Sequence, residues 1–202
     1  LRSLVRQQGA LPAAEVVHIA RALLRALDAA HRGGLLHLDI KPANVLVPPE
    51  GELRLTDFGV AAWRSEIPQL VARGGPAGTP GFIAPEFIKG EAPSERSDLY
   101  SLGRLLVECA TGEHQNLPVT KLAELRKLAD RALQLPEALT RAQPALCKAL
   151  TALCAVDPAA RPDSAAAALA LFHHLPDAGA AEALARRVVS ASGAAPAALA
   201  AA

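Results

Sequence analysis

The feature of this sequence that most constrains its fold is the stretch from Leu35 to Gly59, where polar residues alternate with short apolar runs. Three of these runs are too short for helices and are partly β-branched, so they predict brief strands. The runs are residues 35–37, 45–47 and 53–55. The Pro-Pro-Glu-Gly sequence at 48–51 predicts a turn, and hence a hairpin formed by the second and third runs.

Such a hairpin would bring Asn44 and Asp57 to neighbouring strand ends. Their oxygen atoms are hard ligands that suit Mg²⁺, which is usually held by one or two carboxylates together with substrate phosphates. In the adjoining loop, Asp39 has the chemistry to orient a hydroxyl and accept its proton, and Lys41 supplies a positive charge. A carboxylate base, a cation and a metal site are the groups that typically catalyse phosphoryl transfer.

Five motifs, in order along the chain, resemble those of the eukaryotic-type protein kinases. Residues 37–44, His-Leu-Asp-Ile-Lys-Pro-Ala-Asn, are similar to the catalytic loop, and Asp-Phe-Gly at 57–59 is similar to the metal-binding triplet. Residues 78–86 resemble the end of the activation segment, residues 97–103 the start of the central helix, and residues 157–162 the Arg-bearing turn late in the domain. One motif alone is a weak signal, but the ordered set is specific.

The resemblance implies a bacterial-like serine/threonine protein kinase that transfers the γ-phosphate of ATP to a protein hydroxyl. It implies that Asp39 is the base and that Lys41 neutralises the transferred phosphate. The position of Lys41, two residues after the Asp, is typical of Ser/Thr rather than Tyr kinases. Asn44 and Asp57 would hold Mg²⁺, and Leu46 would form the floor under the adenine of ATP.

The resemblance also implies specific pairs between distant segments. Thr79 would hydrogen-bond the catalytic Asp39 and Lys41, although the residue alone also fits an ordinary turn hydroxyl. Glu86 would pair with Arg161, and an Arg–carboxylate pair of this kind can be bidentate.

Three further polar residues have structural interpretations. His37 is expected to be structural, because the family packs this His against the Phe of the triplet. His31 lies near the end of a predicted helix, where a cation is tolerated, and we expect it to be structural too. Asp98 fits a helix N-cap, whereas the resemblance implies a buried carboxylate that accepts N–H groups of the catalytic loop, and the two interpretations are compatible in part.

The implied fold class is α+β, mainly α: the C-terminal lobe of a protein kinase over residues 1–175, a helical bundle with short β-hairpins at the catalytic loop. Residues 176–202 are Ala-rich and predict a tail or linker, with a helix over 180–189. Apolar periodicity predicts the other helices. They are expected over 1–8, from Pro12 to Gly33, and over 98–109, 118–133, 144–156 and 164–175, the last capped by Asp163 or Ser164.

The activation segment implied by the resemblance runs from Asp57 to Glu86. Within it, residues 63–77 contain Gly74, Gly75 and Pro76 and show no periodicity, which predicts a mobile loop.

Two departures from the family pattern matter. Leu38 stands where many kinases carry an Arg that pairs with a phosphorylated residue of the activation segment, so we expect activity that does not depend on phosphorylation at Ser65 or Thr79. No Gly-rich loop or strand Lys precedes Leu1. We therefore expect a fragment of a longer kinase, inactive without its N-terminal lobe, or alternatively a pseudokinase-like module that binds a protein partner.

Composition adds limits on location and partners. A formal net charge of +1 gives no argument for nucleic-acid binding, and no run approaches the roughly 18 apolar residues of a membrane span. Cys109, Cys147 and Cys154 lie in apolar helical contexts without metal-ligand spacing, so we expect buried free thiols and a cytoplasmic location. Only five of the 21 basic residues are Lys and Ala is abundant, which favours a GC-rich bacterial coding sequence.

Overall fold

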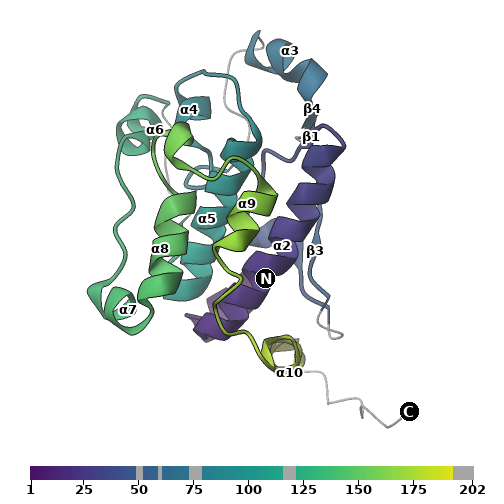
Figure 1. Cartoon of the computed structure of the whole chain (residues 1–202), viewed down its shortest axis with the longest axis vertical. Helices are drawn as coiled ribbons and strands as arrows, with labels where there is room; N and C mark the ends of the chain where they lie inside the picture. Colours follow the sequence, from purple (N-terminus) through teal and green to yellow (C-terminus); the bar gives the residue numbers. More distant parts are fainter. Residues whose placement is uncertain (49–51, 59–60, 73–78, 116–121, 193–202) are drawn as a thin grey trace.

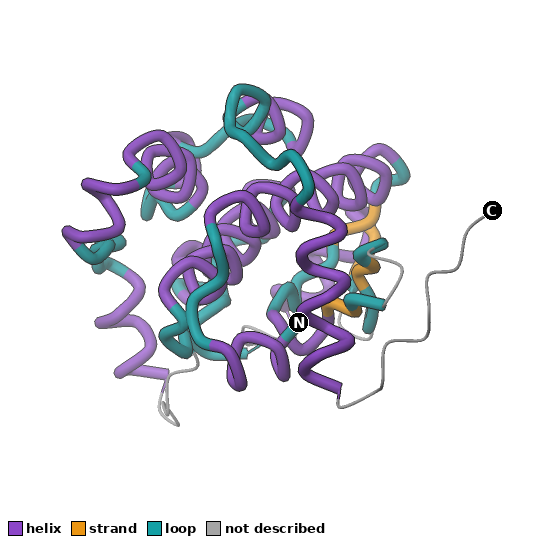
Figure 2. Tube along the Cα trace, turned by 90° about the horizontal axis from the view of Figure 1, so that it is seen from below, coloured by secondary structure: helices purple, strands orange, loops and turns teal. Residues whose placement is uncertain are grey.

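The computed structural model describes residues 1–48, 52–58, 61–72, 79–115 and 122–192. Helices dominate these residues, and their strands form two antiparallel pairs on one side of the helices (Figures 1 and 2). This is the mainly helical α+β fold that the sequence predicts. None of the described helices combines the length and the apolar character that crossing a bilayer requires.

Two long helices, α2 (Ala13–Arg32) and α5 (Glu95–Thr111), lie side by side at the centre of the fold (Figure 1). The apolar stripe of α2 is formed by Val16, Ile19, Leu23 and Leu27, all at most 1% exposed, as the periodicity predicts. Helix α5 is buried around most of its circumference, because α8 (Pro144–Leu153) and α9 (Ala165–Ala170) also pack on it. Residues 97–103, near the start of α5, are therefore all buried.

The contact between α5 and α8 requires a glycine. A Cβ atom on Gly103 would lie 2.7 Å from the sulfur of Cys154 and 2.8 Å from Cβ of Leu153, closer than real side chains approach. Cys154, like Cys109 and Cys147, is a buried free thiol, which confirms that prediction. Burial raises the pKa of the Cys154 thiol to about 12, so it is protonated at neutral pH and fills space in the core.

The short strands form two pairs. β2 (Val45–Leu46) pairs with β3 (Arg54–Leu55) in the predicted hairpin, although residues 49–51 of its turn lie outside the described residues. β1 (Leu35–Leu36) pairs with β4 (Ala62–Trp63). The sequence predicted the first of these strands, but neither β4 nor the pairing.

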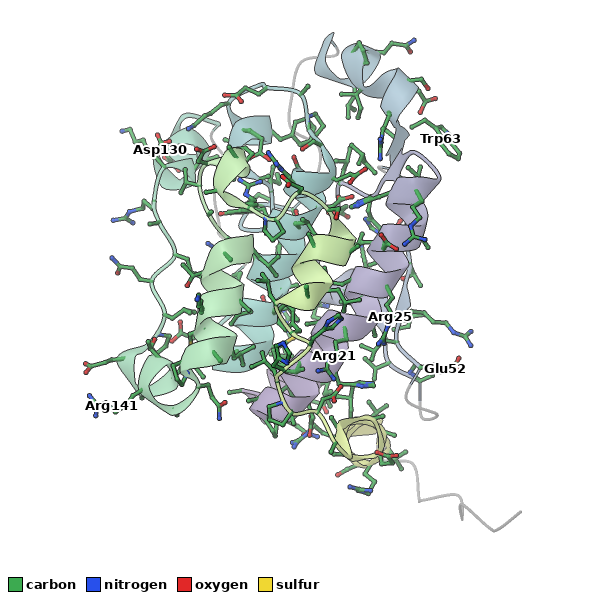
Figure 3. The ribbon with its side chains drawn as sticks, viewed as in Figure 1. Arg21, Arg25, Glu52, Trp63, Asp130 and Arg141 are labelled. Carbon is green, nitrogen blue, oxygen red and sulfur yellow. The ribbon has the colours of Figure 1, made fainter. Side chains whose placement is uncertain are left out.

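The expectation of an irregular loop over residues 63–77 is wrong for its first part. After β4 the chain forms a 3₁₀ turn, η2 (Arg64–Glu66), and then α3 (Ile67–Ala72). Pairing with β1 and burial of Ile67 supply order that local periodicity does not encode. The Trp63 side chain is 52% exposed and points away from the helices (Figure 3). Residues 73–77 lie outside the described part of the chain.

The remaining helices differ from their predicted bounds mainly at the ends. α1 (Arg2–Gln8) was predicted, whereas α4 (Pro85–Ile88) and α7 (Glu137–Ala142) were not. Pro12 is the N-cap of α2 rather than part of its first turn. Ser164, not Asp163, caps α9 by accepting a hydrogen bond from Ala167 N, and η3 (Pro158–Ala160) precedes it. α6 (Leu122–Ala129) is shorter than predicted, and residues 118–121 lie outside the described residues.

Helix α10 (Ala180–Ser192) packs across α1 and α2 (Figures 1 and 2). Leu184 is fully buried in the core, so much of the Ala-rich region is folded onto the rest of the chain. Residues 190–192, expected to belong to the tail, continue this helix. Arg187 forms a bidentate pair with Glu15 of α2, with N···O distances of 2.9 and 3.1 Å, and Glu15 is only 2% exposed.

We predict that Arg187→Met destabilises the fold by roughly 3 kcal/mol, the lower end of the range for breaking a buried ion pair, because Arg187 itself is partly exposed. The cost arises because Glu15 is left charged and buried without its partner. Urea unfolding of the two proteins measures it. Arg186→Met, on the exposed side of the same helix, is the matched control, and equal effects of the two substitutions would contradict the prediction.

Candidate active site

The loop between β1 and β2 brings three of the predicted site residues together. Nζ of Lys41 lies 2.6 Å from Oδ2 of Asp39. Nδ2 of Asn44, the last residue of η1 (Pro42–Asn44), donates to the backbone oxygen of Asp39 at 2.9 Å and to its Oδ2 at 3.1 Å. Asp39 is 8% exposed, so its carboxylate is held in one orientation by a cation and an amide in a nearly dry site.

Thr79, which follows Lys41 by 38 residues in the sequence, also contacts this cluster. Its Oγ1 accepts a hydrogen bond from Lys41 Nζ at 2.8 Å and donates one to Asp39 Oδ1 at 3.2 Å. These are the two hydrogen bonds that the resemblance implied, and an ordinary turn hydroxyl would not make them. Both carboxylate oxygens of Asp39 are therefore engaged, and the activation segment is attached to the catalytic loop.

Asn44 and Asp57 lie at the same end of the β2–β3 hairpin. The backbone N–H of Thr56, next to Asp57, donates to the backbone oxygen of Asn44 at 2.9 Å. Asp57 is exposed and has a φ of +63°, a left-handed conformation that costs a non-glycine residue about 1–3 kcal/mol and is concentrated at functional sites.

The donor set at this end of the hairpin fits Mg²⁺. Both side-chain hydrogen bonds found for Asn44 among the described residues use Nδ2, so its amide oxygen and the Asp57 carboxylate are the hard oxygen donors that this end of the hairpin would offer to Mg²⁺. On β2, the Leu46 side chain is 54% exposed and offers an apolar surface two residues beyond Asn44.

His37 is a structural residue, as expected. Its ring is fully buried and lies 4.5 Å from the ring of Phe58, centroid to centroid, at an interplanar angle of 49°. The backbone N–H of Asp39 donates to Nδ1 at 3.3 Å, so Nε2 carries the ring proton and donates it to the backbone oxygen of Thr56 at 3.2 Å. His37 thereby links the catalytic loop to the strand that leads to Asp57.

Asp98 fixes the backbone immediately before Asp39. Its buried carboxylate accepts the N–H of His37 at 2.9 Å and the N–H of Leu38 at 2.8 Å, and Nε2 of His31 lies 2.8 Å from Oδ2. Leu38 has a φ of +63°, which is unfavourable for a bulky residue, and these hydrogen bonds hold it there.

The interpretation of Asp98 as an N-cap is wrong, because Ser94 caps α5 in a capping box with Ser97. The alternative interpretation, a buried acceptor for the catalytic loop, is confirmed.

The predicted pair between Glu86 and Arg161 is bidentate, with N···O distances of 2.8 and 2.9 Å, and both side chains are buried. The guanidinium also lies over the ring of Tyr100, 4.8 Å from its centroid. All five of its N–H groups are used, because it donates to three backbone oxygens as well. These belong to Arg96, Ala155 and Val156.

The pKa of Glu86 results from opposing effects. Burial by itself raises the pKa, but the hydrogen bonds and charge of Arg161, together with the Ser97 hydroxyl at 2.7 Å, lower it below the ordinary value of 4.5. The pair therefore contributes stability that is present above pH 4.5 and is lost as the pH falls through the lower pKa of the folded state.

We predict that Arg161→Met costs about 3–5 kcal/mol of folding free energy at pH 7, because Glu86 is left charged and buried. Acidification below pH 4.5 should narrow the difference from wild type, since protonation of Glu86 removes the unpaired charge. Urea unfolding at pH 7 and pH 4 measures both effects. Arg141→Met, at an exposed pair with Glu137, is the control, and a loss of the same size there would contradict the assignment.

Comparison with known proteins identifies the family. Residues 1–174 match the family described as the protein kinase domain. This chain belongs to the protein kinase family. The kinase domain is 45% identical over 112 residues to the serine/threonine-protein kinase PknK of Mycobacterium tuberculosis and 43% identical over 112 residues to PknD of the same organism. It is 37% identical over 112 residues to a probable serine/threonine-protein kinase of Clostridium perfringens.

Each of these three alignments covers 55% of this chain but only 10%, 17% and 16% of the respective relative. The kinase domain thus spans a small part of the proteins that it resembles. Helix α10 lies beyond the residues matched to the family.

Sequence reasoning missed several polar residues that support the site of this kinase domain. Ser97 hydrogen-bonds Glu86, and the Ser101 hydroxyl donates to the backbone oxygen of Phe82 at 2.7 Å. Arg64 and Glu95 form an ion pair between the activation segment and α5. Serine and charged residues of this kind are common on exposed loops, so no sequence signal separated them from solvated positions.

Proposed function

We propose that this kinase domain acts in a serine/threonine protein kinase that transfers the γ-phosphate of ATP to a Ser or Thr hydroxyl of a protein substrate. The observation that carries the proposal is the cluster of Asp39, Lys41 and Thr79 around one carboxylate, with Asn44 attached to it. A carboxylate that is held by three donors, from Lys41, Asn44 and Thr79, is suited to receive and orient an incoming hydroxyl.

Each residue has a distinct role in this proposal. Asp39 orients the substrate hydroxyl and accepts its proton as the oxygen attacks phosphorus. Lys41 is a cation close to that carboxylate and neutralises charge on the transferred phosphoryl group. The hydroxyl of Thr79 holds Asp39 and Lys41 in fixed positions relative to each other.

Asn44 and Asp57 would hold Mg²⁺, which when bound supplies positive charge to the phosphates of ATP. Leu46 would lie under the adenine ring.

Further observations support the Ser/Thr assignment and the location. Lys41 follows Asp39 by two residues, and the relatives compared above carry the name serine/threonine-protein kinase. The three free thiols and the use of ATP favour a reducing, cytoplasmic compartment.

We predict that Asp39→Ala in the full-length protein lowers phosphotransfer by at least about 100-fold, because the proton acceptor is removed. Transfer of labelled γ-phosphate to Ser- and Thr-containing peptides measures the rate. Mg²⁺-dependent ATP binding, measured by calorimetry, should persist in the variant.

Asp130→Ala, at an exposed ion pair with Lys89, is the control. Unaltered turnover in Asp39→Ala would refute the role of this carboxylate, and absence of turnover in the wild type would favour a partner-binding module.

We also predict that phosphatase treatment leaves the activity unchanged. Leu38 is buried among apolar side chains and cannot pair with a phosphate, and the Thr79 hydroxyl is already engaged with Asp39 and Lys41. Assays before and after treatment, with mass spectrometry of the activation segment, test this. A large loss of activity traced to a phosphate on Ser65 or Thr79 would contradict it.

A further inference from the structure

Arg64 attaches the start of the activation segment to the elements beneath the catalytic loop. It directly follows β4, and its backbone N–H donates to the backbone oxygen of Gly34 at 2.9 Å. Its guanidinium donates to the backbone oxygen of His31 at 2.8 Å and forms an ion pair with Glu95 in the first turn of α5. One side chain thus contacts the end of α2 and the start of α5.

His31 lies between two carboxylates of α5. Nε2 is 2.8 Å from Oδ2 of Asp98, and Nδ1 is 3.9 Å from Oε2 of Glu95, three residues earlier on the same helix. The ring is 4% exposed, and its buried Nδ1 has no hydrogen-bond partner in the part of the chain that the structure describes. Because Glu95 also pairs with Arg64, a shift of the Arg64 guanidinium would change the position of the Glu95 carboxylate relative to the His31 ring.

A continuous series of contacts therefore leads from the activation segment to the catalytic loop. Arg64 contacts His31 and Glu95, His31 contacts Asp98, and Asp98 holds the N–H groups of His37 and Leu38. The next residue along the chain is Asp39.

Apolar contacts reinforce this attachment on both sides of Arg64. Ala62 and Ile67, which flank it in the chain, pack with Leu36 and Leu38 in one buried cluster. Leu38, the residue held at positive φ before Asp39, is therefore covered by the same segment that Arg64 anchors.

We infer that Arg64 is a positioning residue for phosphotransfer: it holds the start of the activation segment against the His31–Asp98 pair and so fixes the backbone that presents Asp39. This inference rests on the proposed kinase function. Among the described residues, Arg64 forms no hydrogen bond or ion pair with Asp39, and it follows β4 of one strand pair, whereas Asn44 and Leu46 belong to the separate β2–β3 hairpin. Its loss should therefore affect the rate of transfer rather than the binding of ATP.

The test compares Arg64→Ala, Arg64→Lys and Arg54→Ala in the full-length protein. Arg54 is the matched control, because it is 70% exposed on β3 and pairs only with an exposed Glu52 among the described residues. We expect Arg64→Ala to lower kcat for a peptide substrate about tenfold, equivalent to about 1.4 kcal/mol of activation free energy, with the KM for ATP unchanged. Arg64→Lys should recover most of this rate, because a Lys retains the charge that faces Glu95.

Amide hydrogen exchange provides a second measurement that does not depend on turnover. The amides of His37 and Leu38 should exchange faster in Arg64→Ala than in Arg54→Ala, while amides in the middle of α2 stay protected. Unchanged exchange at these two amides, or a kcat equal to that of Arg54→Ala in an active protein, would overturn this inference alone. A wild-type protein without phosphotransfer would overturn the proposed function and the inference with it.

Discussion

The geometry of the candidate site depends on the hydrogen bonds of the Asp98 carboxylate, which is fully buried near the start of α5. A buried charge is costly unless hydrogen bonds compensate for it, and here two backbone N–H groups and the His31 ring surround it. The same hydrogen bonds hold Leu38 in a left-handed conformation that its side chain disfavours. The chain then leaves Leu38 in the direction that brings Asp39 to Lys41 and Thr79.

Helix α5 also contributes to the surroundings of a second buried charge, that of Arg161. Arg161 is bound by Glu86, by the backbone oxygen of Arg96 and by the face of Tyr100, while Ser97 hydrogen-bonds Glu86. The catalytic loop and the end of the activation segment are thus both attached to the first two turns of one helix that is packed on nearly all sides. A site supported in this way has its functional groups held by a helix that is buried around most of its circumference.

Local sequence patterns were sufficient for the parts of the fold that depend on neighbouring residues. The stripe along α2 and the β2–β3 hairpin follow from periodicity and turn composition. The pairing of β4 with β1 was missed, because two-residue strands carry almost no pattern and their order comes from the partner strand. The N-cap of α5 was misplaced for a related reason: Ser94 and Asp98 are both good capping residues, and only the position of the catalytic loop decides which role Asp98 takes.

The sequence by itself determined the chemistry available to this protein and, through the order of its motifs, the family to which it belongs. It supplied Asp39, Lys41, Asn44 and Asp57 within one short stretch, where spacing along the chain already limits their separation. The family resemblance already implied that Thr79 meets Asp39 and that Asp98 accepts N–H groups of the catalytic loop, and the structure contains both contacts. Only the tertiary structure showed that Arg64 meets Glu95 and that β4 pairs with β1. The physical reason is that these contacts join segments whose separation is set by how α2, α5 and the activation segment pack, and no local propensity encodes that packing.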